Sequence, residues 1–150
     1  MRFELVPCGY DGLPVNDEIA LSDTMRANCA MGAELHKRLG YTPPWVGYIA
    51  VADGQPVGGG AFVGAPQGGK VEIAYYTNAD LQGLGHASRT AAALVALARE
   101  AAPSVTLMAM TLPEQNASGR ILDRLGFRRT GTAIDDEAGE VWKWELPPES

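Results

Sequence analysis

The sequence predicts a single-domain α/β (α+β) protein, and three observations lead to that prediction. Its 150 residues are 46% hydrophobic, which is enough for one full core. Seven short segments have the pattern of strands and alternate with helical segments in the order β-αα-β-β-β-α-β-α-β-β. No linker, repeat or change of composition divides the chain, so residues 1–150 are expected to form one domain.

The most informative stretch is Lys70–Ala102, which predicts a strand, a glycine-rich bend and a helix. Residues 71–76 alternate as a strand does, and apolar residues then recur at helical spacing, namely Ala91, Leu94, Val95, Ala98 and Ala102. Between them lies Gln82-Gly83-Leu84-Gly85-His86-Ala87. Glycine permits close approach of a ligand, and a helix start offers unpaired N–H groups with roughly half a positive charge. The bend is therefore a candidate site for a phosphate-type anion.

The N-terminal part predicts a strand followed by helical structure. The strand is expected at Arg2–Val6. Helical structure is expected from Asn16 or Asp17, because either side chain can cap a helix. A break near Ser22-Asp23 would divide this segment into two helices, and Gly40 would end it.

Two further strands are expected before the central stretch. Trp45–Val51 and Val57–Val63 have strand composition, and Asp53-Gly54 between them is typical of a hairpin turn. Gly58-Gly59-Gly60 weakens the second of these strands unless something packs closely against its backbone. The glycines therefore predict a close neighbour.

The C-terminal part predicts a strand, a helix and a final pair of strands. Val105–Met110 is expected to be a strand, and Pro113 suits a first helical position. Gly126 would end that helix. Phe127–Thr132 and Val141–Leu146 are the last two expected strands.

The composition argues against several kinds of partner. The net charge is −6, so attraction to nucleic acid or to an anionic membrane is not expected. The start, MRFELV, has no long apolar segment, and no apolar run approaches about 18 residues. Cys8 and Cys29 form neither a disulfide framework nor a zinc cluster, and His36 and His86 lack partners at metal-ligand spacing. We expect a cytoplasmic protein without a metal.

Three interpretations compete for the glycine-rich bend. It could be a tight connection that binds nothing. A dinucleotide fingerprint is a second interpretation, but Ser88 stands where the third glycine belongs, and residues 77–81 separate the bend from its strand. The third is a pyrophosphate loop for an acyl-coenzyme A. Gln82-x-x-Gly85-x-Ala87 resembles the Q/R-x-x-G-x-G/A motif of the GNAT superfamily of N-acetyltransferases, and Glu72-Ile73-Ala74-Tyr75 resembles the strand before it.

The resemblance extends over nearly the whole chain. The order of elements matches the GNAT fold, a mixed and mostly antiparallel twisted sheet of about seven strands with helices on both faces. Segment 116–127 resembles the closing helix of the family and its Gly-Phe signature. Ser118, with no tyrosine further along that helix, is most similar to the branch that acetylates the N-termini of ribosomal proteins. That branch also contains enzymes that act on small molecules.

The resemblance implies acetyl-CoA as the donor and a primary amine as the acceptor, either a peptide N-terminus or a small molecule. The loop backbone would hold the pyrophosphate, and the preceding strand would hold the pantetheine arm by main-chain hydrogen bonds. We expect a monomer or a homodimer with no nucleic acid or membrane partner. The implied cofactor-binding residues are Tyr75, Tyr76, Thr77, Gln82, Gly83, Leu84, Gly85, His86, Ala87, Ser88, Asn116 and Ser118.

The resemblance also implies catalytic residues. An amine with a pKa near about 10.4 must lose a proton, which costs roughly 4–5 kcal/mol at pH 7. Glu72 occupies the position of the base in several family members; alternatively it caps a neighbouring N–H or faces solvent. Many members protonate the leaving thiolate with a tyrosine at the position of Leu122, so Ser118, Tyr75 or water would serve here. The missing tyrosine also leaves open a non-catalytic module that binds or senses acyl-CoA.

Overall fold

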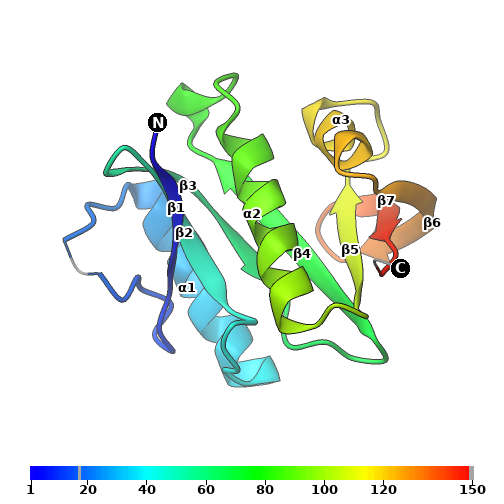
Figure 1. Ribbon diagram of the computed structural model, residues 1–150, viewed down its shortest axis with the longest axis horizontal. Helices are drawn as coiled ribbons and strands as arrows, with labels where there is room; N and C mark the ends of the chain where they lie inside the picture. The colour runs from blue at the N-terminus through cyan, green and yellow to red at the C-terminus, as the bar shows by residue number, and fades with distance from the viewer. Residues whose placement is uncertain (17, 149–150) are drawn as a thin grey trace.

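The computed structural model describes residues 1–16 and 18–148, and its named strands form one sheet in the order β1-β2-β3-β4-β5-β7-β6 (Figure 1). The strands are β1 (Phe3–Pro7), β2 (Gly47–Ala52), β3 (Gln55–Phe62), β4 (Lys70–Thr77), β5 (Thr106–Thr111), β6 (Arg128–Asp135) and β7 (Gly139–Leu146). Only β4 and β5 run parallel, and the other neighbouring pairs are antiparallel. The predicted mixed, mostly antiparallel sheet of seven strands is confirmed.

Helices cover both faces of this sheet. The helices are α1 (Asp23–Leu39), α2 (His86–Ala101) and α3 (Ala117–Arg124), with a short 3₁₀ turn at Ala79–Leu81. In Figure 1, α2 crosses in front of the centre of the sheet, α1 lies behind β1–β3, and α3 lies at the end of β5. No helix in the described part of the chain is both long and apolar enough to cross a membrane.

The N-terminal helical segment is shorter than predicted. The predicted helix start at Asn16 is wrong. The side-chain oxygen of Asn16 instead accepts a hydrogen bond from the backbone N–H of Glu18 (3.1 Å) in a local turn. Asp17, the other candidate, lies outside the described residues. Helix α1 begins at Asp23, where the Ser22 hydroxyl caps the first turn. Polar side chains that bond to their own backbone compete with helix formation, which explains the single helix.

Helix α3 also begins later than predicted. Pro113 does not open it, because the preceding chain makes a turn in which the N–H of Glu114 bonds to the carbonyl of Leu112 (2.7 Å). Asn116 is the N-cap, and its side-chain oxygen accepts the N–H of Gly119 at 3.0 Å. A capping asparagine is the stronger start because it satisfies a helix N–H that would otherwise have no partner.

The glycines of β3 have the close neighbours that the sequence predicts. A Cβ atom on Gly58 would lie 2.2 Å from the carbonyl oxygen of Tyr76, in the neighbouring strand β4. On Gly60 it would lie 2.8 Å from Cδ1 of Leu94, in α2. The missing side chain of Gly60 therefore lets α2 lie close to the sheet, and that of Gly58 lets β3 lie close to β4.

Each face of the sheet has its own apolar core. The core under α2 includes Phe62, Val71, Ile73, Leu94 and Leu107. The core under α1 includes Cys8, Met25, Cys29, Ile49 and Val51. Because side chains alternate along a strand, residues 71, 73 and 75 of β4 face α2, and residues 72, 74 and 76 face α1.

The Gly58→Ala variant is expected to lose about 3 kcal/mol of unfolding free energy, because its methyl group meets backbone atoms that have little room to move. Gly32→Ala is the matched control. Gly32 lies within α1 with nothing within 4 Å of the added Cβ, so alanine there should stabilise the protein by about 0.5–1 kcal/mol. Urea denaturation measures both changes. Equal stabilities for the two variants would contradict the close packing of β3 on β4.

Candidate active site

Strands β4 and β5 part after a short parallel stretch. Their paired positions end at Glu72, which lies opposite Met108. Beyond this point β4 pairs only with β3, as far as Thr77, and β5 pairs only with β7. Figure 1 shows the two strands diverging toward the N-terminal end of α2. From Ile73 onward one edge of β4 is therefore free to form backbone hydrogen bonds.

The glycine-rich loop ends at the N-terminus of α2. Gly83 (φ 83°) and Gly85 (φ 84°) adopt positive φ angles, and Gly85 is an N-cap without a side-chain cap. The first three N–H groups of the helix, those of residues 86–88, thus have no partner within it. The Gln82 side chain donates to the carbonyl of Thr77 (3.4 Å), which joins the loop to the end of β4. The structure brings the predicted loop and the free strand edge together.

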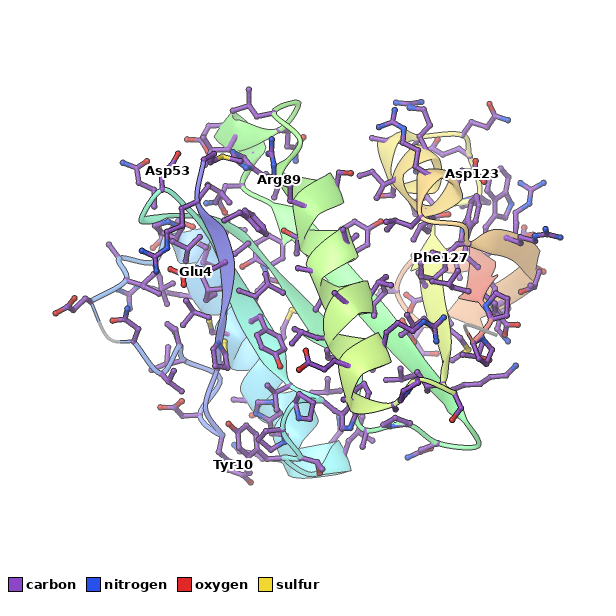
Figure 2. The ribbon with its side chains drawn as sticks, viewed as in Figure 1. Glu4, Tyr10, Asp53, Arg89, Asp123 and Phe127 are labelled. Atoms are coloured by element: carbon purple, nitrogen blue, oxygen red, sulfur yellow. The ribbon has the colours of Figure 1, made fainter. Side chains whose placement is uncertain are left out.

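Arg89 adds a positive charge to this loop. Its Nη1 donates to the carbonyl of Leu84 (3.0 Å) and lies 3.2 Å from the place of a Cβ on Gly85. Figure 2 shows Arg89 at this end of α2. A cation in the first turn opposes the helix dipole, at a cost of roughly 0.3–1 kcal/mol. Sequence reasoning missed Arg89, although this unfavourable position was a usable indication of an anion site.

Glu72 combines partial burial with an open neighbourhood. It is half-buried on the face toward α1, and the next residue on that face, Ala74, is exposed. Burial raises the pKa of the Glu72 carboxyl, and the carboxylate of Asp135 raises it further. Within the described residues its side chain has no ion-pair partner. A carboxyl group with a raised pKa beside an open surface suits proton transfer.

Tyr75 and Ser118 come together from β4 and α3. The Tyr75 hydroxyl is buried and has no hydrogen bond of ordinary geometry in the described structure. Burial raises the pKa of Tyr75 to about 12, and interaction with the Ser118 hydroxyl opposes part of that rise. The tyrosine therefore remains protonated near neutral pH and can donate a hydrogen bond.

Unsatisfied polar atoms continue along the free edge of β4. Besides the Tyr75 hydroxyl, the hydroxyls of Tyr76 and Thr77 and the side-chain oxygen of Asn78 are buried without a partner among the described residues. The Tyr76 side chain packs against the core under α1. Because side chains alternate along a strand, the hydroxyls of Tyr75 and Thr77 lie on the α2 face, and the other two atoms lie toward α1. Buried polar groups are nearly always hydrogen-bonded, so the two hydroxyls on the α2 face are available to a ligand.

Helix α3 separates Ser118 from a cavity of about 320 Å³. Asn116, Gly119, Arg120 and Asp123 line the cavity from one face of the helix, and Ser118 lies on the opposite face. Its other lining residues are Glu114, Gln115, Arg129, Trp142 and Trp144. The predicted contact residue Asn116 already has its oxygen engaged as an N-cap.

The remaining predicted candidates have structural surroundings. Leu122 is fully buried in the core, which agrees with its exclusion as an acid. The buried ring of His86 has its Nδ1 3.5 Å from Nη1 of Arg89, and His36 has its Nδ1 3.0 Å from the carbonyl of Tyr10. No group of three or more metal-ligating side chains occurs in the part of the chain that the structure describes.

Comparison with known proteins establishes the family. The model of the acetyltransferase (GNAT) domain matches residues 18–128. The chain is a GNAT acetyltransferase. The predicted resemblance is thus confirmed. The matched residues include the glycine-rich loop before α2 and the strands β4 and β5. No curated protein matches the chain significantly.

Solved structures share the fold. RimL, a ribosomal L7/L12 alpha-N-protein acetyltransferase in complex with coenzyme A, is 16% identical with a TM-score of 0.70, over 97% of this chain and 94% of that chain. The ribosomal-protein-S5-alanine acetyltransferase of Vibrio fischeri is 16% identical with a TM-score of 0.64, over 88% and 78%. The aminoglycoside acetyltransferase AAC(6′)-Ib with coenzyme A is 23% identical with a TM-score of 0.57, over 68% and 65%.

The Gly85→Val variant is expected to raise the dissociation constant for CoA at least tenfold, or about 1.4 kcal/mol. Valine is strained at φ 84° and its side chain would press on Arg89. Gly54→Val is the matched control, because Gly54 has a similar φ (81°) with open space around it. Calorimetry measures the affinity and circular dichroism the fold. Equal affinities in two folded variants would contradict the loop's assignment.

Proposed function

We propose that this chain transfers the acetyl group of acetyl-CoA directly to a primary amine, with Glu72 as the general base. The observation that carries the proposal is the position of Glu72 at the point where β4 and β5 part. A group bound along the free edge of β4 would end beside this carboxyl. The acceptor would reach it from the open surface next to Ala74.

The donor side fits a pyrophosphate and an amide-containing arm. An anion could accept hydrogen bonds from the unpaired N–H groups of residues 86–88 and from the guanidinium of Arg89. Each hydrogen bond to a charged group stabilises the complex by about 1.5–3 kcal/mol. The free edge of residues 73–77 can pair with an extended arm as a neighbouring strand would. The buried hydroxyls of Tyr75 and Thr77, on the α2 face, offer further partners.

The acceptor side fits a cationic amine. The carboxylates of Glu72 and Asp135 are near enough for the second to raise the pKa of the first. Both attract a protonated amine, and the raised pKa makes Glu72 a better proton acceptor. Glu72 would take one proton from the ammonium group, and the free amine would then attack the thioester carbonyl. As the carbon–sulfur bond breaks, the nitrogen loses its second proton to the departing thiolate or to solvent.

The leaving thiolate needs only a hydrogen bond, since a thiol of pKa about 8.5 is a moderately good leaving group near neutral pH. The Tyr75 hydroxyl, which is protonated and buried, can donate that bond. Ser118 would position it from α3. Tyr75 thus substitutes for the tyrosine that the family often places where this chain has Leu122.

Thiol release across a panel of acceptors tests the proposed reaction. The panel should contain peptides with free N-termini, amino acids, polyamines and aminoglycosides, because the structural neighbours are named for proteins and aminoglycosides. We expect CoA release that depends on an added amine. Tight binding of acetyl-CoA without release on any amine would contradict the proposal and favour a non-catalytic binding module.

The Glu72→Gln variant should lower kcat and kcat/KM about 10²–10⁴-fold with little change in CoA affinity. The defect should shrink as the pH approaches the pKa of the acceptor, because solvent then provides the free amine. A pH–rate profile on one acceptor measures this. Glu4→Gln is the matched control, a strand glutamate on β1 (labelled in Figure 2), which β2 and β3 separate from β4 and Glu72.

Stability separates this role from a structural one. A carboxyl whose pKa is raised in the folded state contributes stability at low pH, and that contribution is lost as the pH rises through the folded-state pKa. Glutamine does not ionise, so the Glu72→Gln variant does not lose stability as the pH rises. At pH 8 its melting temperature should equal or exceed that of the wild type. Slow turnover that tracks a lowered melting temperature would contradict the base role.

A further inference from the structure

The cavity of about 320 Å³ beside α3 lies apart from the candidate active site. The buried residues Gly119 and Trp144 form its floor, and exposed charged side chains form its rim. Trp144 belongs to the core under α2, whereas Glu72 faces α1, so the sheet separates the cavity from Glu72. Pockets that hold small molecules measure about 300–1,000 Å³, and this cavity is at the lower end of that range.

Two cations and two anions share the rim of the cavity. Arg120 and Arg129 carry the positive charges, and Glu114 and Asp123 carry the negative ones. None of the four forms an ion pair in the part of the chain that the structure describes. Exposed ion pairs contribute little to stability, so these groups gain little by neutralising one another. Charges of both signs therefore remain available to a ligand.

Two indole rings give the cavity its aromatic surface. The Nε1–H of Trp144 donates to Oγ1 of Thr111 at 2.9 Å, so the polar atom of that ring already has a partner on β5. The guanidinium of Arg129 lies 4.0 Å from the centroid of the Trp142 ring, and this contact holds the cation in place. The cavity thus combines a positioned cation with a surface on which a planar ring could pack.

Gly119 keeps the floor of the cavity open. A Cβ atom at this position would lie 3.4 Å from Cζ2 of Trp144, which is an ordinary contact distance, so packing alone would admit alanine. Alanine is also the better residue inside a helix. Glycine instead leaves space between α3 and the Trp144 ring, where a ligand could enter.

We propose that this cavity binds a free amino acid with an aromatic side chain. Arg129 would hold the carboxylate, Asp123 the ammonium group, and the two indoles the aromatic ring. A polyanion such as a nucleotide would meet the two rim carboxylates, and a polyamine would meet the two arginines, so the balanced rim disfavours both. The site is additional to the acetyl-transfer site, because the sheet keeps the bound ammonium group away from Glu72.

L-Phenylalanine is the probe that tests the proposal. In ¹⁵N NMR spectra it should shift the indole N–H signals of Trp142 and Trp144 in a saturable manner. Trp45 precedes β2, which β3, β4 and β5 separate from β7, and its signal should stay unchanged. Phenethylamine lacks the carboxylate and 3-phenylpropanoate lacks the ammonium group. Each should bind at least about tenfold more weakly than L-phenylalanine.

Charge variants assign the two ends of the amino acid. Arg129→Gln should weaken the binding of L-phenylalanine at least about tenfold without weakening that of phenethylamine. Arg128→Gln is the matched control, because it removes the same charge from the preceding residue of β6, which does not line the cavity. Asp123→Asn should weaken the binding of L-phenylalanine without weakening that of 3-phenylpropanoate.

Three results would each overturn the proposal. The first is the absence of a saturable shift at Trp142 and Trp144. The second is equal affinity for the three compounds, and the third is an equal loss of affinity in the Arg128→Gln and Arg129→Gln variants. The unchanged Trp45 signal checks that each variant is folded.

Discussion

The separation of β4 from β5 after Glu72 is the constraint on which the rest of the structure depends. While the strands are paired, their backbone groups satisfy each other; once they part, the free edge of β4 needs another partner. Helix α2 packs on one face of the sheet, and Gly60 of β3 leaves room for its side chains there. Its N-terminus consequently ends beside the free edge, and the anion-binding N–H groups lie where an arm along that edge would end.

This arrangement has an energetic cost that a bound ligand would offset. Each buried polar group without a partner costs about 1–3 kcal/mol, and four such groups follow one another in residues 75–78. The two apolar cores on either side of the sheet stabilise the fold despite this cost. Arg89 places a positive charge at a helix N-terminus, where the helix dipole disfavours it. A bound anion would turn this repulsion into a net attraction. The costs at Tyr75, Thr77 and Arg89 arise on the α2 side of the sheet, as expected of a preorganised binding site there, and those at Tyr76 and Asn78 arise on the α1 side.

Local sequence patterns predicted most of the helices and strands. The errors occur at helix starts, where a side-chain turn or a cap competes with the predicted start. The hairpin turn at Asp53-Gly54 has both residues at positive φ (49° and 81°), and the β3 glycines have their close neighbours, as the sequence indicated. The helix starts were wrong at Asn16 and Pro113, because side-chain turns and caps of similar energy compete there. The Gln82–Ala87 motif located the loop. Its sequence did not reveal Arg89, or that Tyr75 approaches Ser118, because those contacts depend on how α2 and α3 pack.

Backbone hydrogen exchange with and without acetyl-CoA tests the central claim most directly, because the claim concerns unpaired N–H groups. Binding should slow exchange at residues 86–88 and along the free edge of β4, residues 73–77. Exchange around the cavity between α3 and β7 should not change, since that cavity lies on the other face of α3 from Ser118. Slowed exchange at the cavity, with the loop and the β4 edge unaffected, would contradict the account.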